Sequence, residues 1–347
     1  MYQHDGDWRA DRRRTDRRRW LGAGAAALLV LGVGTLVVYQ ARSASPSTPA
    51  AATGPEAKPE AVPPPVEELQ FKRVSDPPRT LVVDAAGGTL AVFTDKARTV
   101  RVTGPSRTFA EEAHTTATVT TDAWIRIAPR VWQKSSESET WVRPWLEKAL
   151  ADRSPDALAI AMEYVEGGER DAAFGPLSDT DPDGRAERSD FYDYLGIEWE
   201  FPDGKKERPD PDHIRSLDCS GFLRMVYGYR MGYPLRGTNT RGAGLPRRAY
   251  AMAGFGPGLQ LMPNRGTQAR EYELLNAGDL VFFNGGPVLN DHIEHMGMYL
   301  GVDSEGRHRF ISSRTKANGP TLGDTGGDSL LDGSGHYAVR FRTARRI

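Results

Sequence analysis

Residues 218–227 read Asp-Cys-Ser-Gly-Phe-Leu-Arg-Met-Val-Tyr and contain Cys219, the only cysteine in a chain of 347 residues. Apolar residues at positions 222, 223, 226 and 227 recur at helical spacing, and the Asp, Ser and Gly around the cysteine are typical of a helix start. The stretch therefore predicts a helix with Cys219 in its first turn. The thiol should lie on the apolar face and point into the domain.

A lone cysteine cannot form an internal disulfide, so Cys219 is either a small buried side chain or a reactive thiol. The free backbone N–H groups at a helix N-terminus favour a thiolate and lower the thiol pKa. This position favours the reactive interpretation, because packing alone does not predict it. A nucleophilic thiol also requires a nearby base, which is usually a histidine.

Residues 295–300 read His-Met-Gly-Met-Tyr-Leu and contain the histidine best placed for this role. The run alternates, so His295, Gly297 and Tyr299 share one face of a predicted strand and the apolar residues between them share the other. Gly297 would leave room for a helix end to approach closely. We therefore expect the Cys219 helix to pack beside His295.

Two further segments predict neighbouring strands. Residues 278–283 read as a turn followed by a buried strand, and residues 303–306 read as a hairpin turn into a strand at 308–312. Together they predict an α+β domain in which a helix carrying a thiol packs on an antiparallel sheet carrying an imidazole.

Five motifs occur in an order that resembles the NlpC/P60 cysteine peptidases of bacterial cell walls, which have a papain-like core. They are DCSGF at 218–222, LPR at 245–247, GDLVFF at 278–283, HMGMYLG at 295–301 and HRFISS at 308–313. The resemblance implies that Cys219 is the nucleophile and His295 the general base and acid. It also implies hydrolysis of amide bonds in peptidoglycan stem peptides through a thioester, with Asp218 and Ser220 shaping the turn.

The position that orients the catalytic histidine departs from the family pattern. Family members usually place His, Asn or Gln there, whereas the matching residue is Ser312; a register slip of one residue would select Ser313, and Asp291 is another possible orienting residue. A serine carries no charge and orients an imidazole less firmly. Two alternatives therefore stay open: a weakly active or inactive relative that binds cell wall, and an enzyme of amide or acyl transfer on another polymer.

The N-terminal region predicts a membrane anchor. Residues 1–19 are rich in arginine and should be cytoplasmic, and residues 20–40 lack charge and are long enough to span a bilayer. Residues 41–68, rich in Pro and Ala, should form an extended spacer. We expect a single-pass protein of the bacterial plasma membrane with an extracellular catalytic domain, and a cleaved signal peptide is the alternative.

Residues 69–133 predict a small all-β module, a barrel or a sandwich, because five short β-like runs separated by turn signals lie between residues 80 and 128. Residues 134–347 would form the catalytic domain. The 45 basic and 46 acidic residues nearly balance, so nucleic acid is not an expected partner. No residue pattern indicates a metal site or a cofactor.

Overall fold

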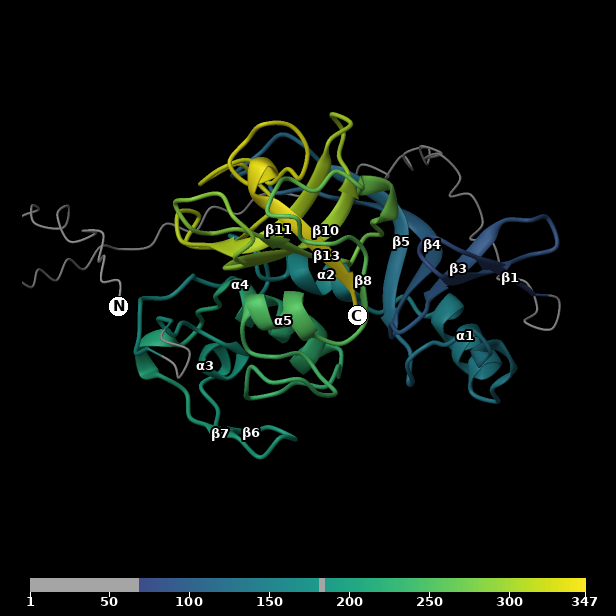
Figure 1. Ribbon diagram of the computed structural model, residues 1–347, viewed down its shortest axis with the longest axis horizontal. Helices are drawn as coiled ribbons and strands as arrows, with labels where there is room; N and C mark the ends of the chain where they lie inside the picture. Colours follow the sequence, from purple (N-terminus) through teal and green to yellow (C-terminus); the bar gives the residue numbers. More distant parts are fainter. Residues whose placement is uncertain (1–68, 181–184) are drawn as a thin grey trace, which may run out of the picture. The chain divides into compact units, whose positions relative to one another are not determined.

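The computed structural model describes residues 69–180 and 185–347, all of which fall in one compact unit (Figure 1). The predicted cytoplasmic tail (1–19), membrane helix (20–40) and linker (41–68) lie outside the described residues. Within the described part, every helix is too short or too polar to cross a bilayer.

The N-terminal module is one antiparallel sheet whose strands follow chain order. Its members are β1 (Gln70–Val74), β2 (Arg79–Val83), β3 (Thr89–Thr94), β4 (Thr99–Phe109) and β5 (Val119–Ile127). The five runs predicted between residues 80 and 128 leave out β1, and the last two of them, 117–121 and 124–128, both overlap β5. Because β1 and β5 are the two edges of a single sheet, the predicted closed barrel or sandwich is wrong.

Helix α1 (Val142–Ala151) packs on this sheet. Its buried residues Val142 and Leu146 lie in the same apolar cluster as Phe93 of β3 and Trp132. The predicted boundary at 133/134 therefore does not separate two cores, because the first helix after it belongs with the module. The module also contributes to the second core. Val119 and Ile125 of β5 belong to the large apolar cluster formed mainly by residues after 156.

The second sheet has the order β12-β11-β10-β9-β13-β8. The strands are β8 (Leu259–Gln260), β9 (Leu280–Phe283), β10 (His295–Val302), β11 (His308–Arg314), β12 (Gly319–Thr321) and β13 (Phe341–Arg346). The antiparallel arrangement of β9, β10 and β11 confirms the sequence prediction. Strand β13 was not predicted, because four of its positions are polar or charged; Arg346 is nevertheless buried and pairs with Asp279 at 2.7 Å.

Three helices follow the module in chain order and lie near this sheet. They are α2 (Ala157–Met162), α4 (Cys219–Leu223), which continues as a π-helical segment (Arg224–Arg230), and α5 (Ala249–Phe255); Figure 1 shows α4 and α5 beneath the strands β10 and β13. Smaller elements are α3 (Phe191–Leu195), β6 (Trp199–Glu200), β7 (Lys206–Glu207) and 3-10 turns at Ser136–Ser138, Pro211–His213, Tyr272–Leu274 and Ala338–Arg340. The sheet and helix layers thus place the start of α4 beside β10.

The contact between α4 and β10 differs from the expected one. Met296 and Met298 lie in the same apolar cluster as Phe222 of the helix, so the methionine face of β10 packs on α4. A Cβ at Gly297 would meet the carbonyl oxygen of Ile311 at 2.6 Å, so the close approach at this glycine is made by β11 and not by a helix end.

Candidate active site

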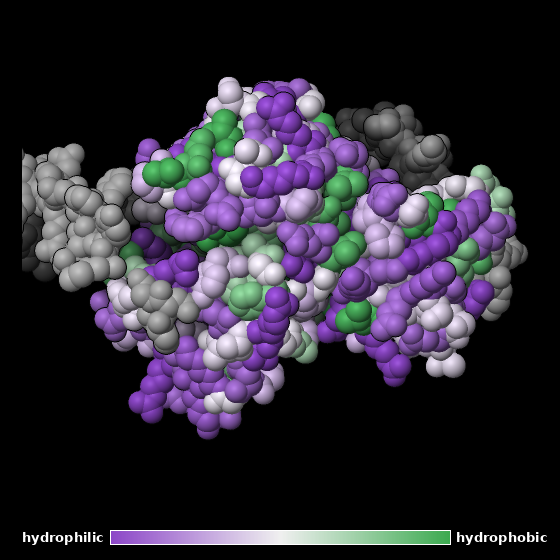
Figure 2. Space-filling view, in the orientation of Figure 1, coloured by the Kyte–Doolittle hydropathy of each residue, from purple (hydrophilic) through white to green (hydrophobic). Residues whose placement is uncertain are grey.

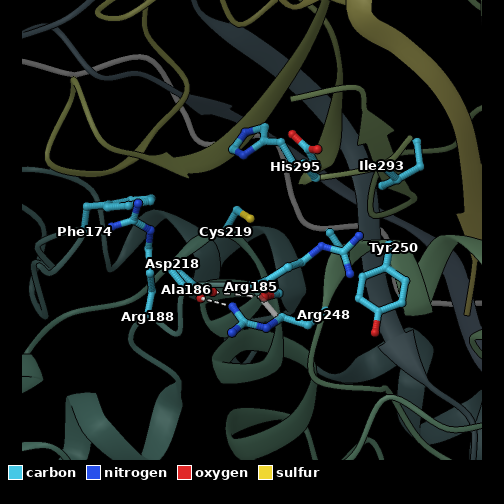
Figure 3. Close-up of a pocket in the computed structure, with 13 residues that line it drawn as sticks. Phe174, Arg185, Ala186, Arg188, Asp218, Cys219, Arg248, Tyr250, Ile293 and His295 are labelled. Carbon is cyan, nitrogen blue, oxygen red and sulfur yellow. Dashed lines mark hydrogen bonds and ion pairs between the residues drawn. The ribbon is translucent and has the colours of Figure 1, made fainter. Parts of the chain in front are cut away.

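Cys219 and His295 line the same pocket, which has a volume of about 170 Å³ (Figure 3). Cys219 is the first residue of α4, and His295 is the first residue of β10. The structure therefore brings together the two residues that the sequence singled out. Figure 2 shows mainly hydrophilic residues on this face of the molecule, with apolar side chains visible in the recess between the sheet and the helices.

The start of α4 is defined by Asp218. This residue is the N-cap, and its Oδ1 accepts a hydrogen bond from Gly221 N–H at 2.6 Å and from Ser220 Oγ at 3.0 Å. The cap satisfies a backbone donor that the first helical turn would otherwise leave unpaired. Asp218 and Ser220 shape the turn on which Cys219 lies.

The thiol of Cys219 is half-buried, and the backbone N–H of Met296 lies close enough to its sulfur to favour the thiolate. Burial and the adjacent Asp218 carboxylate raise its pKa to about 12, against the weaker opposing effects of Met296 N–H, Arg247 and Arg248. The sequence prediction of a lowered thiol pKa is therefore wrong for the resting site. The helix start is capped by a negative charge, which offsets the favourable field of its N–H groups.

Buried ion pairs support this turn from behind. Arg247 Nη2 lies 2.9 Å from Asp218 Oδ2, and Arg247 Nε lies 3.3 Å from Asp190 Oδ2. Asp190 in turn accepts from Arg224 Nε at 3.0 Å. Burial opposes the charged form of Asp218, but Arg247 outweighs it and lowers the pKa of Asp218 to about 2. The carboxylate behind Cys219 is thus ionised and paired.

His295 lies against the ring of Tyr337, at 5.3 Å between ring centroids, and its Nε2 is 3.2 Å from Oγ of Ser312 on β11. Burial, which is the largest cause, together with the charges of Arg314 and His336, lowers the pKa of His295 to about 3. The imidazole is therefore neutral over the physiological range.

The structure distinguishes the three candidates for orienting His295. Ser313 points to the other face of β11, where its Oγ donates to the carbonyl of Leu217 at 2.5 Å. Asp291 lines a different pocket, beside His292. Of these three residues, only Ser312 forms a hydrogen bond with His295 in the described part of the chain.

Ser312 has a second partner that the sequence did not indicate. Arg314 Nε lies 3.2 Å from Ser312 Oγ, and the rest of its guanidinium donates to the carbonyl of Gly327 and to Ser329. Arg314 is buried and its guanidinium lies 4.5 Å from the ring centroid of Tyr337. Ser312 Oγ therefore bridges the imidazole of His295 and the positively charged guanidinium of Arg314.

In this resting geometry the thiol and the imidazole share the pocket without a hydrogen bond between them in the described structure. With the thiol pKa raised and the imidazole pKa lowered, both groups are neutral near pH 7. A rotation of either side chain is needed before a proton can pass between them.

The supporting residues Asp190, Arg224, Arg247 and Arg314 were not identified as site residues from the sequence. Arg247 lies in the LPR motif, which supported the family resemblance but did not indicate what this arginine does. Arg224 lies only five residues after Cys219, but Asp190 and Arg314 lie far from it along the chain, and only the fold brings these charges together.

Comparisons with known proteins address the same region. The NlpC/P60 family matches residues 203–321. A protein described as similar to a lipoprotein of the NLP/P60 family, from Staphylococcus aureus subsp. aureus Mu50, has a solved structure that matches with 19% identity and a TM-score of 0.26. The match covers 59% of this chain and 48% of that protein, so the chain spans about half of its length. No curated protein matched the sequence.

The family assignment rests on the sequence match, which includes Cys219, His295 and Ser312. Members of this family are typically cell-wall peptidases. Residues 203–321 are therefore a domain of the NlpC/P60 family.

Proposed function

We propose that this protein is a cysteine hydrolase of amide bonds in peptidoglycan stem peptides. The observation that supports this most is that Cys219 and His295 line one pocket within a domain of the NlpC/P60 family. His295 would accept the thiol proton as the sulfur attacks the scissile carbonyl carbon, and would then donate it to the leaving amine. Water would hydrolyse the resulting thioester with His295 again as the base.

The surroundings suit this sequence of steps. The backbone N–H of Cys219, at the start of α4, can donate to the oxyanion that forms on the carbonyl oxygen. The backbone N–H of Met296, which favours the charged form of the thiol, would stabilise the thiolate. Ser312 would accept the Nε2–H of the imidazolium and orient its ring.

The direct experiment incubates purified peptidoglycan with the full-length protein and identifies the released peptides by mass spectrometry. We expect release by the wild-type protein and none by Cys219→Ala or His295→Ala. His292→Ala is the matched control, because His292 is exposed and lies only three residues from His295. Undiminished release by Cys219→Ala would overturn the proposal.

A second candidate is a weakly active or inactive relative that binds cell wall in the same pocket. The neutral resting pair and the uncharged Ser312 favour it. In that case, the wild-type protein and Cys219→Ala would sediment equally with peptidoglycan, and neither would release peptides.

We also propose that residues 20–40 anchor the protein in the plasma membrane with its catalytic domain outside. The charge-free run and the preceding arginines support this. A test introduces Thr53→Cys into the Cys219→Ala protein and treats intact cells with a membrane-impermeant maleimide. Labelling of position 53 in the membrane fraction is expected. Labelling only after lysis, or recovery in the culture medium, would contradict the anchor.

A further inference from the structure

The pocket at Cys219 has an unusual charge lining. Three arginines contribute to its wall, Arg185, Arg188 and Arg248. The two lining carboxylates are Asp218 and Glu294, and Asp218 pairs both with Arg247 from behind the pocket and, at 3.9 Å, with the lining Arg248. The described wall therefore has more positive than negative charge next to the thiol.

Arg188 is the most informative of the three. Its side chain is half-buried, and its guanidinium lies 5.0 Å from the ring centroid of Phe174. In the described part of the chain no carboxylate forms an ion pair with it, whereas the neighbouring Arg247 pairs with Asp218 and Asp190. A half-buried guanidinium that no carboxylate neutralises can gain a charge-assisted hydrogen bond when a carboxylate ligand reaches it.

The guanidinium of Arg188 lies on the same pocket wall as the sulfur of Cys219. Figure 3 shows Arg188 with Phe174 on one side of Cys219, and Arg185 with Tyr250 on the other. Burial lowers the pKa of Arg188, while the nearby Asp218 and Cys219 raise it, so its guanidinium is within electrostatic reach of the thiol. The Phe174 ring restricts the plane of the guanidinium, which prepares it for a planar anion.

We propose that Arg188 binds a carboxylate of the substrate beside the scissile bond, so that the pocket selects acidic peptides over their amidated counterparts. This inference rests on the proposed function only for the identity of the reacting peptide; the anion preference is a property of the pocket. Guanidinium groups bind carboxylates through two parallel N–H···O bonds, which a carboxamide cannot accept equally.

The test uses the only cysteine as a reporter. Iodoacetate and iodoacetamide differ by a carboxylate in place of a carboxamide, and each alkylates the thiolate, forming an S–C bond and releasing iodide. The ratio of the two rates does not depend on the thiolate fraction, because the same thiol reacts in both cases. Mass spectrometry of the full-length protein gives each rate without ambiguity, and 2-mercaptoethanol supplies the reference ratio.

We expect the iodoacetate-to-iodoacetamide ratio at Cys219 to exceed the reference by about tenfold, the scale of one charge-assisted hydrogen bond. Added salt should reduce the excess. Arg188→Gln should return the ratio to within about twofold of the reference, and Arg188→Lys should retain part of the excess. Arg208→Gln, which removes a guanidinium from an 85% exposed side chain, should leave it unchanged.

An unaltered ratio in Arg188→Gln, or a wild-type ratio equal to the reference, would overturn the proposal. Thermal unfolding of each variant shows whether it is folded, and the Lys variant provides the comparison if Gln impairs folding. Alkylation requires no hydrolysis, so the two proposals fail separately. Peptide release without an anion preference refutes only the role of Arg188, and an anion preference without peptide release refutes only the hydrolase.

Discussion

The Oγ atom of Ser312 lies 3.2 Å from Nε2 of His295 and connects two neighbouring strands, β10 and β11. The same oxygen accepts a hydrogen bond from Arg314 Nε–H, which can only donate. The hydroxyl retains one lone pair and its proton for the imidazole. For His295 to accept the thiol proton at Nδ1, its Nε2 must carry the hydrogen in both the neutral and the charged ring, and the free lone pair of Ser312 can accept from Nε2–H in both states.

Ser312→Ala should reduce kcat for peptide release about five- to tenfold with little change in KM, because it removes one orienting hydrogen bond and no substrate contact. Steady-state kinetics on a defined muropeptide measure this. Ser313→Ala is the matched control: it removes the bond to the Leu217 carbonyl on the opposite face, and should lower the urea midpoint while leaving kcat within about threefold. Equal kcat values for the two variants would contradict the role of Ser312.

Arg314→Gln should raise the pKa of His295, because it removes a positive charge that disfavours the imidazolium. Since neutral His295 is the base, the acidic limb of the pH–activity profile should move to higher pH, by about one unit. NMR titration of the His295 ring protons gives the pKa directly. Arg314→Lys preserves the charge and should leave the limb near its original position. A limb that shifts equally in both variants would indicate a loss of geometry.

Alkylation of Cys219 by iodoacetamide should accelerate about tenfold per pH unit from pH 7 to 10 without a plateau, because its thiol pKa is about 12. The same shift affects stability. The folded pKa lies above the ordinary value of 9.0, so this contribution to stability is complete below about pH 9 and is lost as the pH rises towards 12. Cys219→Ala should lack that alkaline loss. A plateau near pH 7 would show an activated thiolate.

Asp218→Asn should lower the free energy of unfolding by about 3 kcal/mol, because it leaves Arg247 buried with one of its two carboxylates missing. Urea denaturation measures the change. Asp122→Asn, which removes an ion pair with Arg101 at an aspartate whose side chain is 49% exposed, should cost no more than about 0.5 kcal/mol. Similar values for both variants would show that the buried pair contributes no special stability.

The helix start at Cys219 and the strands β9 to β11 could be predicted because local patterns define them: apolar spacing, a capping Asp and a short hairpin turn. The thiol pKa could not, because it depends on burial and on Asp218, which is itself paired with an arginine 29 residues away in the chain. Arg314 was missed for a similar reason. From sequence alone, an arginine in a strand is expected to be exposed. Arg314 is buried because the Gly327 carbonyl and the Ser329 hydroxyl accept its hydrogen bonds.

The position of β13 has a practical consequence for dissecting this protein. The family match ends at residue 321, yet β13 (Phe341–Arg346) lies between β9 and β8 in the catalytic sheet. A fragment cut at the family boundaries would expose one edge of β9 and leave Asp279 without Arg346. Glu111 of the module accepts from Thr321 and from the backbone of Leu322 and Gly323, next to the loop that contacts Arg314. The smallest fragment that folds on its own should therefore retain both the β-module and the last strand.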